Sequence, residues 1–166
     1  MALRSMLLTC AVSAAFCASG AAQPDVRVEA SHLQGPRPLQ EQTQSAAVRD
    51  YLHAWQTMNA AFDRNDVAAL DRDFVGTAHD KLADAVRQQA AMGLHARYID
   101  KAHDIQIAFY SPEGLSIELT DTVQYDIQVL DHDKLQTTQQ VSARYIVVLT
   151  PAEVRWRVRV FQAQFE

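Results

Sequence analysis

Residues 115–129, with the sequence LSIELTDTVQYDIQV, alternate apolar and polar side chains with one exception. A two-residue period of this kind is typical of a strand that packs one face on a core and exposes the other. Because β-structure twists, a strand of this length has to coil strongly, so the pattern predicts a curved sheet. The exception is Asp121, a carboxylate that falls on the apolar face.

The same two-residue period recurs in three other segments, at 105–109, 135–149 and 154–160. The segments between these strands contain Pro, Gly or Asp, which are the residues that hairpin connections favour. The C-terminal half of the chain is therefore predicted to form a four-stranded antiparallel meander, in which each strand pairs with the next one.

The N-terminal half has a helical period instead. Apolar residues recur at steps of three and four over 46–64, which predicts the longest helix of the chain. A short second helix is expected at 67–71, capped by Asn65 or Asp66, and a third over 78–92. The predicted fold class is α+β, with three N-terminal helices packed on a strongly curved four-stranded antiparallel sheet in a cone-like shape.

The N-terminal residues have the pattern of a secretory signal. A short positive start is followed by an apolar run over 6–18 and by small residues, so cleavage is expected after Ala22. The run is shorter than the roughly 20 residues that a membrane-spanning helix needs. A retained membrane anchor is therefore the less favoured alternative.

The predicted organisation is a signal peptide at 1–22, an extended linker at 23–45 and a cone-shaped α+β domain at 46–166. The signal predicts an exported protein, either periplasmic or secreted. Both cysteines, Cys10 and Cys17, lie in the signal. The mature chain is therefore expected to have no disulfide and no cysteine metal site.

The long amphipathic helix VRDYLHAWQTMNAAFDRN, the segment 65–70 and the closing strand at 154–160 resemble the cone-shaped superfamily named after nuclear transport factor 2. The resemblance covers residues 46–165. In layout it is closest to the domains of mitochondrial Tim-type import subunits and to the intermembrane-space domains of plastid-division proteins, and it implies a non-catalytic binding or scaffolding role. The superfamily also includes ketosteroid isomerase, scytalone dehydratase and SnoaL-like polyketide cyclases.

Asp121 defines the candidate site. The expected hairpin register sets Ile105 across from Asp121 and His103 on the diagonal, while the next strand places Ala143 or Tyr145 on the other side. The side chains expected to contact a ligand on the concave face are Asp121, His103, Tyr145, Trp55, Tyr125 and Trp156. For the two tryptophans, core packing is the simplest role.

Two interpretations of Asp121 remain open. In an apolar cavity, with His103 as its partner and Tyr145 as an oxyanion donor, Asp121 would support proton-transfer catalysis. In the other interpretation the chain has no catalytic residue, and Asp121 lies at a β-bulge or at the sheet margin, where it reaches water.

Charge and residue spacing limit the partners. A net charge of −5 argues against nucleic acid. The histidines lack metal-ligand spacing and there is no Gly-rich phosphate loop, so no metal and no cofactor are expected. Arg155, Arg157 and Arg159 are expected on the outer face of the last strand, either neutralised by neighbouring carboxylates or open to peripheral membrane contact.

The preferred functional hypothesis is an exported, non-enzymatic binding or scaffold domain. It would use the cone cavity for a small apolar ligand or a sheet face for a protein partner. The alternative is a cofactor-independent isomerase or dehydratase that uses an acid/base residue in the cone. A homodimer through the outer or open sheet face is a further expectation.

Overall fold

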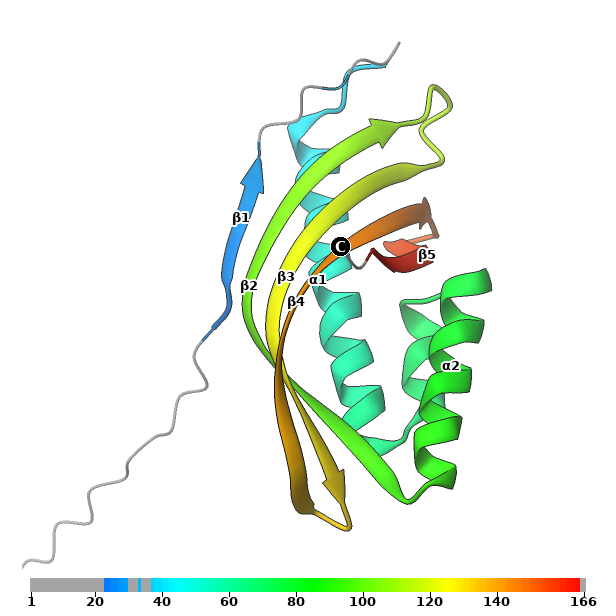
Figure 1. The fold of residues 1–166 in the computed structure, drawn as a ribbon. Coiled ribbons are helices and arrows are strands. Elements are labelled where there is room, and N and C mark those ends of the chain that lie inside the picture. The colour runs from blue at the N-terminus through cyan, green and yellow to red at the C-terminus, as the bar shows by residue number, and fades with distance from the viewer. Residues whose placement is uncertain (1–22, 30–32, 34–36, 165–166) are drawn as a thin grey trace, which may run out of the picture.

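A computed structural model of the chain describes residues 23–29, 33 and 37–164 of the 166 in the sequence (Figure 1). The expected signal at 1–22 lies outside the described residues. In chain order the elements are β1 (Asp25–Glu29), α1 (Glu41–Arg64), the 3-10 helix η1 (Val67–Arg72), α2 (Gly76–Ala91), β2 (Leu94–Tyr110), β3 (Ile117–Asp131), β4 (Lys134–Pro151) and β5 (Trp156–Gln164).

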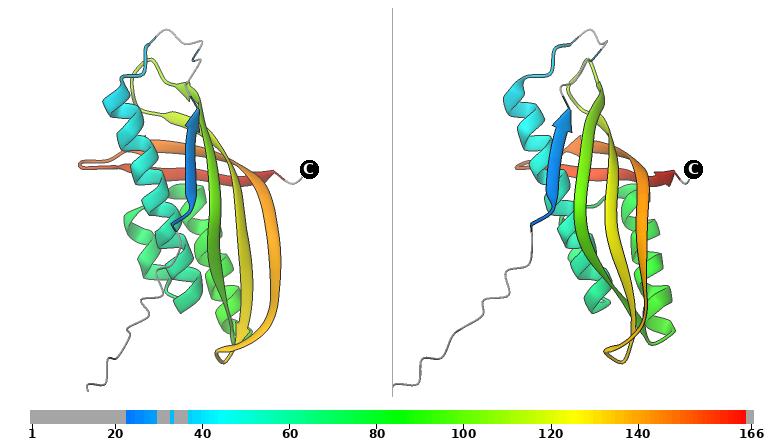
Figure 2. Two further views of the ribbon diagram at one scale, coloured as in Figure 1. Left: turned by 90° about the vertical axis from the view of Figure 1, so that its left-hand side faces the viewer. Right: turned by 60° about the vertical axis from the view of Figure 1, so that its left-hand side comes forward.

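The strands form one sheet in the order β1-β2-β3-β4-β5. β2 to β5 form the predicted antiparallel meander, whereas β1 pairs in parallel with the middle of β2. The sheet curves strongly, and the helices lie on its concave side (Figures 1 and 2). The predicted α+β class with helices on a curved sheet is confirmed.

The prediction of four strands was wrong, because β1 adds a fifth strand within the segment that was expected to be a linker. All five residues of β1 are exposed, and their partners are the backbone groups of Ala102–Gln106 on β2. A strand held mainly by backbone hydrogen bonds buries no apolar face, so it leaves little trace in the hydrophobic pattern.

The first two helices also differ in detail from the expectation. α1 begins at Glu41 rather than at 46, and its added residues, Glu41–Ser45, are exposed or half-buried, so they extend no apolar stripe. The second helix is the 3-10 helix η1. Of its two predicted caps, Asp66 is the one observed, since its carboxylate accepts from the Ala68 amide at 3.1 Å.

The core lies between α1 and the concave face of β2 to β5. The residues of α1 that are buried in it are Ala47, Val48, Tyr51, Ala54, Trp55, Met58, Ala61 and Phe62. On β3 the odd-numbered positions from Ile117 to Tyr125 are buried, as the alternation predicted. Toward the β3–β4 turn, Ile127 of β3 still packs against the core and Leu130 is buried, whereas Lys134–Gln140 of β4 are exposed.

The edge of β5 is covered by the segment that joins η1 to α2. The amide of Val75 donates to the carbonyl of Val158 at 2.9 Å, and the amide of Val158 donates to the carbonyl of Asp73 at 2.8 Å. Arg155 donates to the carboxylate of Asp73 at 3.1 Å, and Arg157 donates to the carbonyl of Phe74 at 2.9 Å.

Two of the three arginines of the predicted outer row are thus bound to this covering segment rather than presented as a free cationic surface. Arg155 pairs with the buried carboxylate of Asp73. Arg157 also donates to the carbonyl of Asp71, in the last turn of η1, where carbonyls lack partners within the helix. In the described part of the chain, no helix combines the length and apolar character that a membrane span requires.

Candidate functional site

Asp121 lies in the middle of β3, on the face that meets the helices. It pairs with Ile105 of β2 and with Tyr145 of β4, as the expected register placed it. Its exposed fraction is 0%. The interpretation that placed Asp121 at a bulge or at a wet sheet margin was wrong, because the register shifts of β3 lie elsewhere and the side chain is fully buried.

Two donors from two other elements hold the Asp121 carboxylate. His103 Nδ1 on β2 lies 2.7 Å from Asp121 Oδ2, and the Tyr51 hydroxyl on α1 donates to the same oxygen at 2.7 Å. The second oxygen, Oδ1, is buried and has no hydrogen-bond partner among the described residues. The result is a buried acid–base pair, hereafter the Asp121–His103 pair, with a tyrosine as its third member.

Tyr51 is the member of this group that sequence reasoning missed. Burial raises the pKa of its phenol well above the ordinary value, and the negative charge and hydrogen bond of Asp121 raise it further. The hydroxyl therefore stays protonated and acts as a permanent donor to the carboxylate. A signal was available, because Tyr51 is four residues before Trp55 and so shares the buried face of α1.

Tyr145 lies beside Asp121 in the ladder but directs its hydroxyl elsewhere. The Tyr145 and Tyr125 hydroxyls lie 3.0 Å apart. Burial first, and this hydrogen bond second, raise the pKa of Tyr145 far above the ordinary value. The structure thus brings Asp121 and His103 together as predicted, while Tyr145 is hydrogen-bonded to a second tyrosine.

Trp55 fills the space in front of the Asp121–His103 pair. Its indole ring meets the His103 ring edge-on at a centroid distance of 5.2 Å and the Tyr145 ring at 5.3 Å. The indole Nε1 donates to the Asp100 carboxylate at 2.9 Å, which Asn59 also contacts at 2.9 Å. Trp55 is consequently locked by packing and by a hydrogen bond, and its exposed fraction is 1%.

Trp156 lies apart from these rings, at the start of β5. Its backbone amide donates to the Asp50 carboxylate at 2.9 Å, and its side chain is half-buried at the edge of the core. Of the six side chains expected to contact a ligand, the structure gathers Asp121, His103, Trp55, Tyr125 and Tyr145 in the cone and leaves Trp156 elsewhere.

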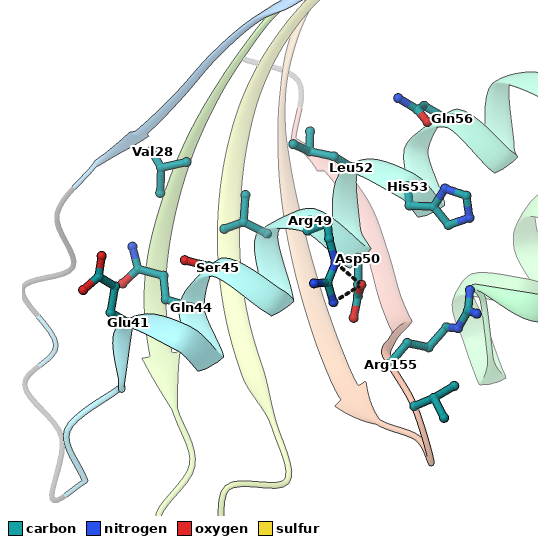
Figure 3. Close-up of a pocket in the computed structure, with 12 residues that line it drawn as sticks. Val28, Glu41, Gln44, Ser45, Arg49, Asp50, Leu52, His53, Gln56 and Arg155 are labelled. Atoms are coloured by element: carbon teal, nitrogen blue, oxygen red, sulfur yellow. Dashed lines mark hydrogen bonds and ion pairs between the residues drawn. The ribbon is translucent and has the colours of Figure 1, made fainter.

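A second feature lies outside the cone, along the exposed face of α1. It is a groove of about 890 Å³, hereafter the α1 groove, with β1 at one end and the residues before β5 at the other (Figure 3). Its lining residues are Val28, Glu41, Gln44, Ser45, Val48, Arg49, Asp50, Leu52, His53, Gln56, Val154 and Arg155. Sequence reasoning assigned none of these residues to a cavity.

Charges at the α1 groove are largely neutralised by their neighbours. Arg49 pairs with Asp50 at 2.9 Å, and Arg155 pairs with the buried Asp73 at 3.1 Å. Burial by itself would raise the pKa of Asp73, but the hydrogen bonds from Thr57 and Arg155 outweigh it and lower the pKa below its ordinary value. The exposed apolar side chains of the groove are therefore the groups that gain most from being covered by a partner.

Metal ligation has no support in this geometry. Among the described residues no group of three His, Cys, Asp or Glu side chains is placed to hold a metal ion. The expectation of a metal-free and cofactor-free protein stays a prediction.

Two solved structures have a similar arrangement of helices and strands. The intermembrane-space region of the chloroplast protein ARC6 matches with a TM-score of 0.62 and 13% identity, over 78% of this chain and 100% of that one. A putative scytalone dehydratase from Novosphingobium aromaticivorans matches with a TM-score of 0.52 and 12% identity, over 76% and 89% of the two chains.

The chain has a nuclear-transport-factor-2-like fold. Aln2 from a Streptomyces species is a further similar structure, with a TM-score of 0.51 and 10% identity over 77% of this chain and 94% of that one. No protein-family model matches the chain, and no curated protein is detectably similar to it in sequence. At these identities the likeness establishes the fold, and the roles of the residues have to come from the site itself.

We predict that Tyr51→Phe lowers the free energy of unfolding by about 1.5–3 kcal/mol, because a buried carboxylate loses one of its two donors. Equilibrium urea unfolding measures the change. Tyr98→Phe is the matched control, since the Tyr98 hydroxyl makes no side-chain hydrogen bond to a described residue. A Tyr51→Phe protein as stable as Tyr98→Phe would contradict the assigned role of Tyr51.

A second prediction concerns acid stability. Because the pKa of Asp73 is lowered in the folded protein, its carboxylate stabilises the fold above its ordinary pKa of 3.8. That contribution is lost as the pH falls through the lowered value. Asp73→Asn should cost roughly 1–3 kcal/mol at neutral pH, and the difference from wild type should shrink below pH 3.8.

Urea unfolding across a pH series checks this prediction. Asp84→Asn is the control, because Asp84 is an exposed carboxylate whose partner, Arg87, lies one turn along the same helix. Its replacement should change the stability by less than about 0.5 kcal/mol at every pH. A cost of Asp73→Asn that stays constant down to acid pH would contradict the assignment.

Proposed function

We propose that this protein is an exported, non-catalytic binding domain whose α1 groove receives an extended segment of a partner polypeptide. The observation that carries the proposal is the contrast between the two sides of α1. The Asp121–His103 pair on the buried side of α1 is closed, whereas the groove of about 890 Å³ on its other side is open.

The closed state of the pair argues against catalysis. His103 is 2% exposed and Asp121 is 0% exposed, and the Trp55 ring packs edge-on against the His103 ring. A general acid or base has to come within hydrogen-bond reach of the proton that it transfers. In this packing the carboxylate instead meets its own protein donors, which is how a buried polar group is tolerated in a core.

The dimensions of the α1 groove suit an extended peptide. Its floor runs along α1 from Glu41 to Gln56, which at 1.5 Å per residue spans about 22 Å. An extended segment of about seven residues has the same length. Figure 3 places Val28 near one end and Arg155 near the other, with residues of α1 between them.

The chemistry of the α1 groove favours apolar side chains on the partner. Val28 is 42% exposed and Val154 is 82% exposed, and Leu52 also lines the groove. Because the nearest charges are paired within the domain, a partner gains more by covering these apolar groups than by adding charge.

Two observations support export. The N-terminal residues have the composition of a secretory signal. The part of ARC6 that is similar in structure is its intermembrane-space region. The partner would then be encountered outside the cytoplasm.

The second candidate function is a cofactor-independent dehydratase or isomerase. It is favoured by the 2.7 Å contact between Asp121 and His103 and by the fold likeness to a putative scytalone dehydratase. It requires Trp55 to leave the position that its hydrogen bond to Asp100 now holds.

The groove proposal predicts the outcome of a selection from a random peptide phage library against the purified protein. Enriched peptides should carry apolar residues, and Leu52→Asp should weaken their binding at least about ten-fold, because a charge would be desolvated in the contact. Gln88→Asp, on the exposed side of α2, lies outside the groove lining and should leave the affinity unchanged.

Peptides whose binding ignores Leu52→Asp would contradict the groove proposal, as would a selection that enriches none. A small molecule that copurifies with the protein from its own host, and is lost in Asp121→Asn, would favour the second candidate. Native mass spectrometry would detect it.

Export makes a separate prediction. N-terminal sequencing of the protein recovered from its own host should begin at Gln23, directly after the expected cleavage site. Recovery of the uncleaved chain from the cytoplasmic fraction would contradict export and leave the groove proposal intact.

A further inference from the structure

Two stretches at the edges of the sheet are protected against pairing with another strand. β1 covers Ala102–Gln106 of β2, and β1 itself carries charges at alternate positions, Asp25, Arg27 and Glu29. At the other side, the segment that follows η1 covers β5 through two hydrogen bonds with Val158. Charged residues and covering segments are the usual means by which natural sheets block edge-to-edge association.

The N-terminal half of β4 has neither kind of protection. β5 pairs with β4 only from Arg144 to Pro151. Among the described residues no strand pairs with Lys134–Val141 on the side away from β3. The carbonyl of Lys134 accepts from the Gln136 side chain at 3.3 Å. The rest of this stretch, hereafter the open β4 edge, presents backbone amide and carbonyl groups that no neighbouring strand pairs with.

The composition of the open β4 edge is also unusual for an exposed strand. After Lys134 its sequence is LQTTQQV, which contains no charge, no Pro and no Gly. Residues 134–140 are all exposed, and Leu135 is 51% exposed. A long, uncharged edge without a breaker is a template for strand addition.

We infer that the open β4 edge pairs antiparallel with the same edge of a second copy, so that two sheets join into one. This inference uses a surface apart from the α1 groove and does not depend on the proposed function. The argument for a second copy as the partner is electrostatic. The chain carries a net charge of −5, so two copies repel each other in general, and an uncharged strip is where their backbones can approach.

Two-fold symmetry makes the strip complementary to itself. In an antiparallel pair related by a two-fold axis, each side chain meets one from the same face of the other copy. Thr137 then faces Thr137 or Gln139, and Gln136 faces Thr138 or Gln140. Hydroxyl and amide groups both donate and accept hydrogen bonds, so these pairs form without opposing like charges. The exposed Leu135 is covered in the same contact.

The test is a charge swap at Thr137, with sedimentation velocity as the readout of dimerisation. The wild-type protein should form a concentration-dependent dimer. Thr137→Lys alone and Thr137→Asp alone should each raise the dimer dissociation constant at least about five-fold, because like charges then lie directly opposite or diagonally across the new strand pair. An equimolar mixture of the two variants should restore a dimer, which shows that both are folded and that their edges meet.

Gln88→Lys, on the exposed side of α2, is the matched control and should leave the dissociation constant unchanged. A wild-type protein that stays monomeric at millimolar concentration would overturn the inference. A dimer that is indifferent to both Thr137 variants would overturn it too, as would a mixture that fails to re-form the dimer.

Discussion

The carboxylate of Asp121 is shared by three elements, and the packing of the domain depends on it. A buried carboxylate is costly unless donors surround it. Here one donor comes from α1 and the other from β2, at 2.7 Å each. A slip of β3 by one residue would expose Asp121 and bury its threonine neighbours, Thr120 and Thr122. The rotation of α1 and the register of the sheet are therefore fixed together.

The alternation of apolar residues was enough to predict this part of the sheet. It paired Asp121 with Ile105 and allowed its pairing with Tyr145, because strand register follows from period and turn length. The apolar stripe that predicted α1 consists of Val48, Leu52, Trp55, Met58 and Phe62. Tyr51 was missed because this stripe runs through its neighbour Leu52, which lies in the α1 groove. The groove itself joins Val28, Leu52 and Val154, residues so distant in sequence that no local period connects them.

The two faces of α1 divide the domain into a closed side and an open side. On the closed side Tyr51 and Trp55 are ordered by hydrogen bonds to Asp121 and Asp100, so their movement would leave buried carboxylates without donors. On the open side Leu52 is partly buried against the core, whereas Gln56 is exposed. Rigidity of the first face preorganises the second, because a groove built on a fixed helix loses little entropy when a partner binds.

The geometry of the sheet allows the groove and the dimer to act together. β1 and β4 are separated by β2 and β3 in the strand order, so a second copy joined at the open β4 edge approaches from the side opposite to β1. In such a dimer each copy would carry its own α1 groove. Two linked grooves bind a partner that carries two matching segments more tightly than either groove alone, because the second contact forms within the same complex. A weak groove and a weak strand contact can therefore give a stable assembly without a large interface in either place.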